Sequence, residues 1–197
     1  MTEAKTLILA SKSAARRAIL TGAGVPFTVQ VADVDEDTLK TPGVDPASLA
    51  EDLARAKALA VSAQRPEALV LGADQTLAFD GGLVSKAPDL AAARARLITM
   101  RGRSHQLHSG AALALGGQIL WSGVDTVQMR MRDYSDTFLD AYLATEGAEL
   151  LACVGSYRLE GMGAQLFAQV EGDYFTVLGL PLWLVLDQLR KAGMILS

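Results

Sequence analysis

The first half of the chain alternates short apolar runs with longer mixed segments, a pattern typical of strands followed by helices. Residues 6–10, Thr-Leu-Ile-Leu-Ala, predict a short buried strand. The Ala/Arg/Leu-rich segment after them predicts a helix that ends near Gly22 or Gly24. Residues 26–32 alternate apolar and polar side chains and predict a second strand.

In the next segments, residues that cap helices or form turns mark the ends of the predicted elements, in addition to the pattern of apolar positions. A helix is predicted from Pro46 to about Ser62, because Asp45 can cap its first turn and proline suits the first helical position. Residues 68–73 predict another buried strand, which ends at Asp74. Asp80-Gly81-Gly82 predicts a turn, and a further amphipathic helix begins at Pro88.

Longer strands dominate the second half. Residues 105–115 and 118–131 flank Gly116-Gly117, a strong signal for a two-residue hairpin. Ser135 caps a predicted helix that runs to about Thr145, and residues 164–176 predict another hairpin around Glu171-Gly172-Asp173. A last helix begins near Pro181 and has a buried stripe made of Leu182, Val185, Leu186 and Leu189. These elements together predict an α/β fold with a mixed sheet.

Composition narrows the class of protein. The 197 residues suit one domain or two closely joined lobes, and charges or glycines interrupt the apolar runs before they could span a membrane. The N-terminus lacks the layout of a signal peptide and Cys153 is the only cysteine, so we expect a cytoplasmic location. The net charge of −4 argues against a protein that binds nucleic-acid polymers, because such proteins normally have a basic surface.

The turn between the first strand and the first helix is a candidate phosphate site. Ser11 and Ser13 provide hydroxyl groups there, and Arg16 and Arg17 follow at the start of the helix. A helix N-terminus attracts anions through its free N–H groups, and a guanidinium group matches phosphate oxygens. The alternative is that Ser13 only caps the helix and that the arginines are solvated.

Asp74, which follows Gly72 and Ala73 at the end of a predicted strand, is a second candidate. Ligands of α/β proteins gather at such strand ends, where an aspartate can hold a metal ion or accept a proton from water. It could equally cap the following turn. Glu36, Lys57 and Lys86 are isolated charged residues, and each one taken alone is more simply explained as structural.

Two further features argue against zinc or thiol chemistry. His105 and His108 lie three residues apart, which on a strand directs their side chains to opposite faces, so we expect no zinc site. Cys153 lacks neighbours that would activate a nucleophile, and we expect it to be a small buried hydrophobic residue.

Taken in order, these segments resemble the Maf-like family of nucleotide pyrophosphatases over nearly the whole chain. The resemblance is carried by Leu7 to Ser13, Glu36, Lys57, Gly72-Ala73-Asp74, Lys86, Gly102 to Gly110, Gly155-Ser156-Tyr157, and Glu171-Gly172-Asp173 through Leu182. It implies an elongated, two-lobed α/β fold of the Maf/ITPase type. Residues 1–197 would then form one domain around a central nucleotide-binding cleft.

The resemblance also implies an activity and roles for these residues. A nucleoside triphosphate would be hydrolysed to monophosphate and pyrophosphate, which removes non-standard or modified nucleotides from the pool. Asp74 would be the general base, and Glu36 with Asp74 would bind Mg²⁺ or Mn²⁺. The residues that would hold the triphosphate are Ser11, Ser13, Arg16, Lys57 and Lys86.

Three alanines depart from the family pattern. Ala14 replaces the usual proline, and Ala15 replaces an arginine or tryptophan. Ala87 separates Lys86 from Pro88, which the family usually has side by side. These changes leave the charged groups in place but can alter the rigidity of both loops.

Ala15, Gln75 and Glu160 bear on the choice of base. Gln75 and Glu160 resemble the branch that acts on 7-methyl-GTP, and a glutamate can accept hydrogen bonds from the N1–H and N2 amino groups of guanine. Ala15 replaces the tryptophan of that branch, so a stacking surface for a cationic base is missing at this position. We therefore expect a guanine-type substrate, with 7-methyl-GTP as one candidate.

A second hypothesis is a nucleotide-sensing regulator of cell division that binds triphosphates without hydrolysing them. The combination of Asp74 with Lys57, Lys86 and Glu36 favours catalysis, because a sensor needs no base. Homodimers are common among soluble enzymes of this kind, but no feature of the sequence identifies an interface. We expect neither a nucleic-acid polymer nor a membrane as partner.

Overall fold

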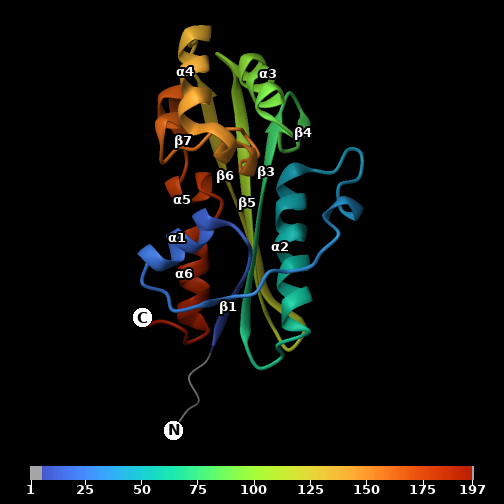
Figure 1. Cartoon of the computed structure of the whole chain (residues 1–197). Coiled ribbons are helices and arrows are strands. Elements are labelled where there is room, and N and C mark those ends of the chain that lie inside the picture. The colour runs from blue at the N-terminus through green and yellow to red at the C-terminus, as the bar shows by residue number, and fades with distance from the viewer. Residues whose placement is uncertain (1–5, 197) are drawn as a thin grey trace.

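Within residues 6–196, seven strands form one mixed sheet, and helices pack on both of its faces (Figure 1). The computed structural model describes residues 6–196, and residues 1–5 and 197 lie outside the described part. The expectation that the chain has no signal peptide depends partly on residues 1–5, so it also falls outside the described part. The strands are β1 (Leu7–Ala10), β2 (Thr28–Val29), β3 (Leu69–Phe79), β4 (Gly82–Val84), β5 (Ser104–Leu115), β6 (Gln118–Met131) and β7 (Phe167–Glu171). The α-helices are α1 (Ala14–Gly22), α2 (Pro46–Ser62), α3 (Leu90–Met100), α4 (Asp136–Glu146), α5 (Tyr174–Val177) and α6 (Leu182–Lys191). Three 3₁₀ helices are η1 (Glu36–Thr38), η2 (Gly147–Ala152) and η3 (Met162–Leu166).

The order of the strands leaves a stretch of β3 free at one edge. The order is β2-β1-β3-β5-β6-β7, with β4 folded back against the end of β3. Strands β2, β1 and β3 are parallel and the remaining pairs antiparallel, so the predicted mixed α/β sheet is confirmed. Strand β1 pairs with β3 only as far as Gly72, and β4 begins to pair at Leu77. Residues 73–76 therefore lie between the end of β1 and the start of β4.

Most of the predicted end signals are confirmed. The carboxylate of Asp45 accepts a hydrogen bond from Ser48 N at 2.8 Å and caps α2, which begins at Pro46. Ser135 caps α4 in the same way. Gly116 and Gly117 have φ values of 58° and 75°, the left-handed conformation that a tight hairpin between β5 and β6 requires.

Three predictions about strands are wrong in whole or in part. Strand β3 does not end at Asp74, because β5 pairs with it from Val70 to Ala78. The hairpin predicted for residues 164–176 does not form: Asp173 accepts a hydrogen bond from Thr176 N at 3.0 Å and caps helix α5, so no strand returns. Strand β2 contains two residues of the predicted 26–32, and both are exposed at the edge of the sheet.

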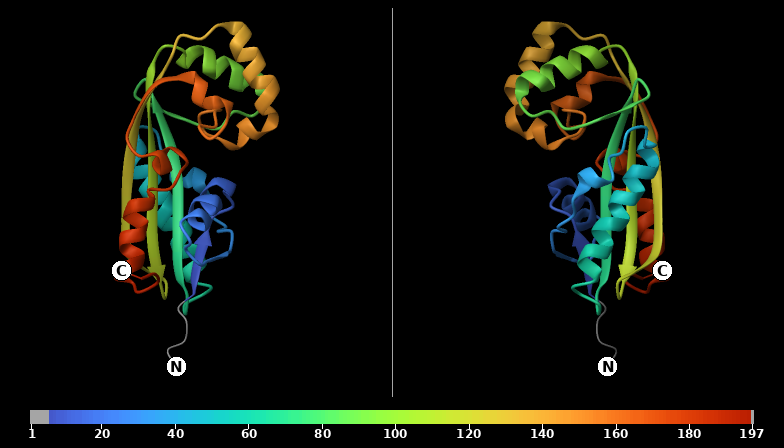
Figure 2. Two further views of the ribbon diagram at one scale, coloured as in Figure 1. Left: turned by 90° about the vertical axis from the view of Figure 1, so that its left-hand side faces the viewer. Right: turned by 90° about the vertical axis from the view of Figure 1, so that its right-hand side faces the viewer.

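Two hydrophobic clusters occupy opposite ends of the sheet and define two lobes. In the α1/α6 lobe, Leu9 and Leu71 pack against Ile19 of α1 and Val185 of α6. In the α3/α4 lobe, side chains from β5 and β6 pack against α3 and α4. The left view of Figure 2 shows α3 and α4 extending from the sheet to the side on which α1 lies. Among residues 6–196, no helix has the length and apolar character that crossing a membrane requires.

Candidate active site

Three of the predicted charged residues meet beside the free edge of β3. The Nζ atom of Lys57 lies 2.6 Å from Oε1 of Glu36 and forms an ion pair with Oδ2 of Asp74. The side chains of Lys57 and Asp74 are only 14% and 12% exposed, whereas that of Glu36 is 39% exposed. Charges so shielded from water are stable only when they are paired, so the ammonium group holds both carboxylates at this place.

Two glycines explain why Lys57 can reach Asp74. Gly72 of β3 and Gly110 of β5 lie directly under α2, and a Cβ atom at either position would meet the backbone of that helix. At Gly72 this atom would lie 2.6 Å from Ala58 N, next to Lys57 itself. Because alternate residues of a strand share a face, Asp74 points to the same side of the sheet as Gly72. Close packing of α2 on the sheet therefore sets the ion pair.

Arg16 lies at the N-terminal end of α1 and connects two other segments. Its Nε donates to the carbonyl oxygen of Gly179 at 2.8 Å, and its Nη1 donates to the hydroxyl of Ser11 at 3.2 Å. Ser13 caps the helix by accepting from Arg16 N at 3.4 Å. Burial lowers the pKa of Arg16, while the charges of Asp74 and Glu36 oppose that shift. The guanidinium group stays charged and feels the same two carboxylates as Lys57.

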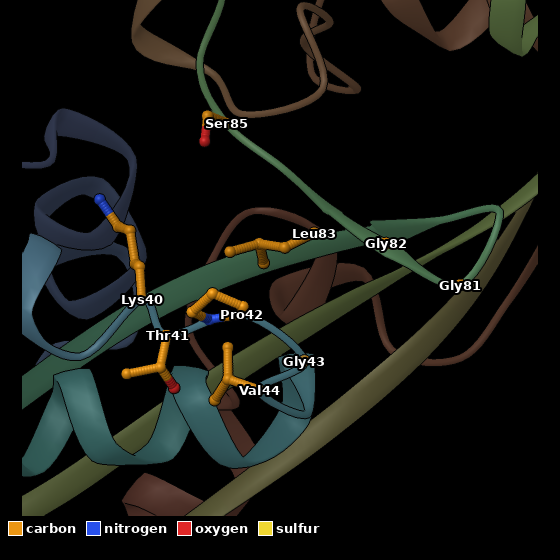
Figure 3. Close-up of a pocket in the computed structure, with 9 residues that line it drawn as sticks. All are labelled: Lys40, Thr41, Pro42, Gly43, Val44, Gly81, Gly82, Leu83 and Ser85. Atoms are coloured by element: carbon orange, nitrogen blue, oxygen red, sulfur yellow. The ribbon is translucent and has the colours of Figure 1, made fainter.

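Lys86 lies apart from this ion-pair network. Its side chain is exposed in the segment after β4, and within residues 6–196 it forms no ion pair. Figure 3 shows the adjoining residues 81–85 facing residues 40–44 across a cavity of about 350 Å³. Lys40 borders this cavity and lies 3.8 Å from Oε2 of Glu36. Lys40 was not predicted from the sequence, although its position four residues after Glu36 was a signal.

A second cavity, of about 580 Å³, brings together two residues that were predicted to select the base. Ala15 of α1 and Glu160 of the segment before η3 both line it. Among the described residues of this lining, Glu160 alone is charged, and its Oε1 accepts from Arg158 Nε at 3.4 Å. Phe175 and Trp183 supply aromatic rings to the lining. The sequence analysis missed both, although Trp183 lies off the apolar stripe of its helix.

Gln75 does not line that cavity. Its side-chain amide donates to Ser109 Oγ at 3.1 Å and lies 3.0 Å from the carbonyl oxygens of Thr176 and Val177. The residue therefore ties β3 to α5, which carries Phe175. A role of Gln75 in base selection stays a prediction, and it would act through the position of α5.

The oxygen ligands at Glu36 and Asp74 fit a hard divalent cation. Mg²⁺ and Mn²⁺ prefer carboxylate and phosphate oxygens, and Mg²⁺ is usually bound by one or two carboxylates together with substrate phosphates. Within residues 6–196, no three His, Cys, Asp or Glu side chains gather into a metal cluster. His105 and His108 have separate partners, Tyr157 and Thr126.

The sequence of the chain is similar to those of known proteins over most of its length. The profile of the family described as Maf, Maf-like protein, matches residues 6–192. The chain is 49% identical over 190 residues to the nucleoside triphosphate pyrophosphatase of Maricaulis maris, which covers 95% of this chain and 97% of that protein. The protein of the same name from Caulobacter vibrioides is 48% identical over 189 residues, 94% of each chain. The 7-methyl-GTP pyrophosphatase of Mesorhizobium japonicum is 47% identical over 193 residues, which cover 96% of this chain and 97% of that protein.

Proposed function

The chain belongs to the Maf-like protein family, and we propose that it hydrolyses a nucleoside triphosphate to the monophosphate and pyrophosphate. The observation that carries this proposal is the ammonium group of Lys57, held between the carboxylates of Glu36 and Asp74 close to Arg16. Such a site offers cations to a polyphosphate and a shielded carboxylate to a water molecule in one place. The names of the relatives support the same reaction.

Binding of the triphosphate depends on cations from several elements. Lys57 comes from α2 and Arg16 from α1, and the exposed Lys86 would approach from the segment after β4. The nine-residue helix α1 begins beside Arg16 and follows the turn in which Ser11 and Ser13 add hydroxyl groups. Together these groups offset the charge of about −4 that a triphosphate carries.

Asp74 is the proposed general base. One of its carboxylate oxygens accepts from Gln75 N at 2.6 Å, and the other is paired with Lys57, which leaves further lone pairs for a water proton. The water oxygen attacks the α-phosphorus as its proton passes to Asp74. The bond from the α-phosphorus to the oxygen that bridges to the β-phosphorus then breaks, and its electron pair leaves with pyrophosphate.

Glu36 and Asp74 would hold the divalent cation, Mg²⁺ or Mn²⁺, which neutralises charge on the phosphates and polarises the phosphoryl group when bound. The substrate we propose is a guanine-type nucleotide, including modified forms such as 7-methyl-GTP, and the role is removal of such nucleotides from the pool. The single cysteine supports a cytoplasmic location. We treat residues 1–197 as one domain because a single sheet runs through both lobes, and we keep a homodimer as an expectation.

The experiment that tests the reaction is a panel of triphosphates with Mg²⁺ or Mn²⁺, in which the products are separated by chromatography. Asp74→Asn should lower kcat by about 10²- to 10⁴-fold because the general base is lost, while the nucleotide still binds. Asp140→Asn, at an exposed carboxylate of α4, is the matched control and should retain activity.

Two outcomes would contradict this proposal. If the parent protein binds nucleotides and hydrolyses none, the second hypothesis of a nucleotide-sensing regulator of cell division takes its place. If Asp74→Asn turns over as fast as the parent protein, Asp74 is not the base.

A further inference from the structure

The cavity lined by Ala15 and Glu160 has a chemical character unlike that of the phosphate site. Its wall is apolar, built from Ala15, Ala18 and Ile19 of α1 and from Leu182, Trp183 and Leu186 of α6. Figure 1 shows α1 and α6 on the same side of the sheet, with α5 close to them. A pocket with apolar walls and a single carboxylate suits a flat aromatic ligand that carries N–H donors.

Trp183 stands out in this wall because it is held in place and yet exposed. Its indole Nε1 donates to Oδ1 of Asp173 at 2.9 Å, and its ring meets the ring of Phe175 edge to face at a centroid distance of 5.7 Å. Asp173 is itself fixed, since it caps α5. Even so, Trp183 is 62% exposed. Within residues 6–196, no other aromatic residue among the exposed large hydrophobic side chains is as exposed. The polar edge of the indole is thus satisfied while much of the ring stays uncovered.

The cavity and the proposed phosphate site share helix α1. Ala15 lines the cavity, and the next residue, Arg16, donates to Ser11 in the phosphate-binding turn. Arg16 also donates to Gly179, which follows Leu178 of the cavity wall. A ligand with phosphates at Arg16 and Lys57 would therefore extend its other end along α1 into the cavity. A nucleotide has this layout, with a charged end and a flat aromatic end.

We propose that Trp183 is the stacking surface for the base of the nucleotide and a specificity-determining residue of this chain. The inference rests on the proposed function, which supplies the nucleotide. The small side chain of Ala15 leaves room over the cavity, and Trp183 offers from α6 the aromatic face that position 15 lacks. Glu160 accepts hydrogen bonds from the N–H groups of a guanine-type base. A purine covers more of the indole than a pyrimidine does, and a cationic base gains further attraction.

The first test compares hydrolysis by three variants on 7-methyl-GTP, GTP and UTP. Trp183→Ala should lower kcat/KM for GTP by about 5- to 150-fold, mainly through KM, because stacking on the base is lost. The loss should be largest for 7-methyl-GTP and smallest for UTP. Trp183→Phe should restore most of the activity because it keeps an aromatic face. Leu184→Ala, at the neighbouring exposed residue outside the cavity wall, should behave like the parent protein.

Equal losses on all three nucleotides would overturn the proposal, because a merely structural tryptophan would not distinguish bases. An equal loss in Leu184→Ala would overturn it as well. Both results leave the proposed reaction standing if the parent protein still produces monophosphate and pyrophosphate.

A second test reads Trp183 directly, without turnover. The chain has two tryptophans, so Trp121→Phe leaves Trp183 as the single tryptophan, which can be excited selectively at wavelengths that tyrosine does not absorb, and Asp74→Asn in the same protein blocks hydrolysis. GTP should quench the fluorescence of this double variant in a saturable way, and UTP should quench it less. Absence of quenching by GTP, despite GTP binding measured by calorimetry, would overturn the proposal. Quenching by GTP in a protein whose parent hydrolyses no triphosphate would refute the reaction and support the stacking role.

Discussion

The two ends of the proposed nucleotide site are built in different ways. At the phosphate end, Lys57 and Asp74 are nearly shielded from water, and close contact between α2 and two glycines of the sheet fixes their positions. At the base end, α1, α6 and the segment with Glu160 meet around an apolar cavity, and Glu160 is exposed. The first end is set by backbone packing, and the second by side chains of α1, α6 and the segment with Glu160, of which Trp183 and Glu160 are exposed. We therefore expect that substitutions at the base end can change which base is accepted without changing the hydrolysis itself.

The largest effect should follow from breaking the packing under the phosphate end. In Gly72→Ala the new Cβ atom would meet the backbone of Ala54 and Ala58, and backbone cannot move aside as a flexible side chain can. The free energy of unfolding should fall by about 3 kcal/mol. Activity should fall too, because the turn of α2 that moves carries Lys57. Urea unfolding and hydrolysis of GTP measure the two effects.

Gly82→Ala is the matched control for this substitution. Gly82 also lies in a strand, but its nearest neighbour for a Cβ atom is Phe79 O at 3.7 Å, an ordinary contact. The control should change the free energy of unfolding by less than about 0.5 kcal/mol. If Gly72→Ala is as mild as Gly82→Ala, the close approach of α2 does not set the phosphate end.

The difference between the two ends also explains what the sequence could predict. The helix that begins at Asp45-Pro46 and the hairpin at Gly116-Gly117 were predicted correctly from their local end signals. Glu36 and Lys57 are isolated charged residues in the sequence, so only the resemblance to a family named them as site residues. That Lys57 and Glu36 meet Asp74 could not be derived from spacing, because the ion pairs join segments far apart in the chain.

The base end was harder to predict because long-range contacts override its local signals. Glu171-Gly172-Asp173 has the composition of a hairpin turn, yet Asp173 caps α5 and binds the indole of Trp183. Thr176 of the same helix donates to Asp125 of β6 at 2.7 Å. These partners lie at positions that no local pattern reveals. The role of Trp183 therefore needed the structure.

Lowering the pH should reduce the free energy of unfolding by less than Gly72→Ala does, and the base end should be destabilised before the phosphate end. His105 lies 2.6 Å from the hydroxyl of Tyr157, which leads into the segment with Glu160. Burial lowers the pKa of His105 from 6.5 to about 4. Between these values the unfolded chain binds a proton that the folded protein does not, so this contribution to stability is complete above pH 6.5 and declines as the pH falls toward 4. From pH 7 to 5 the loss should be ~2 kcal/mol.

Urea unfolding at both pH values measures this loss, and His105→Gln separates it from other titrating groups. Glutamine keeps a hydrogen-bonding group but takes up no proton, so the variant should lose ~2 kcal/mol less than the parent protein between pH 7 and 5. Protection from hydrogen exchange near residues 157–160, corrected for the intrinsic exchange rate at each pH, should fall at pH 5 more than protection in β3 does. The same pH dependence in parent and variant would show that His105 does not couple acid to this region.

The smallest effect should come from Glu160→Gln, which removes one charge and changes little else. This substitution therefore gives the clearest test of the difference between the two ends. Glu160→Gln keeps the size of the side chain but loses the carboxylate that accepts from two donors of guanine. Arg158 keeps a partner in Glu146 at 3.3 Å, so the loop should hold its place. The kcat/KM for GTP should fall about tenfold through KM, whereas that for UTP should change little. Glu149→Gln, at an exposed glutamate of η2, is the control. A fall in kcat at unchanged KM would place Glu160 in the chemistry and remove the proposed division between the two ends.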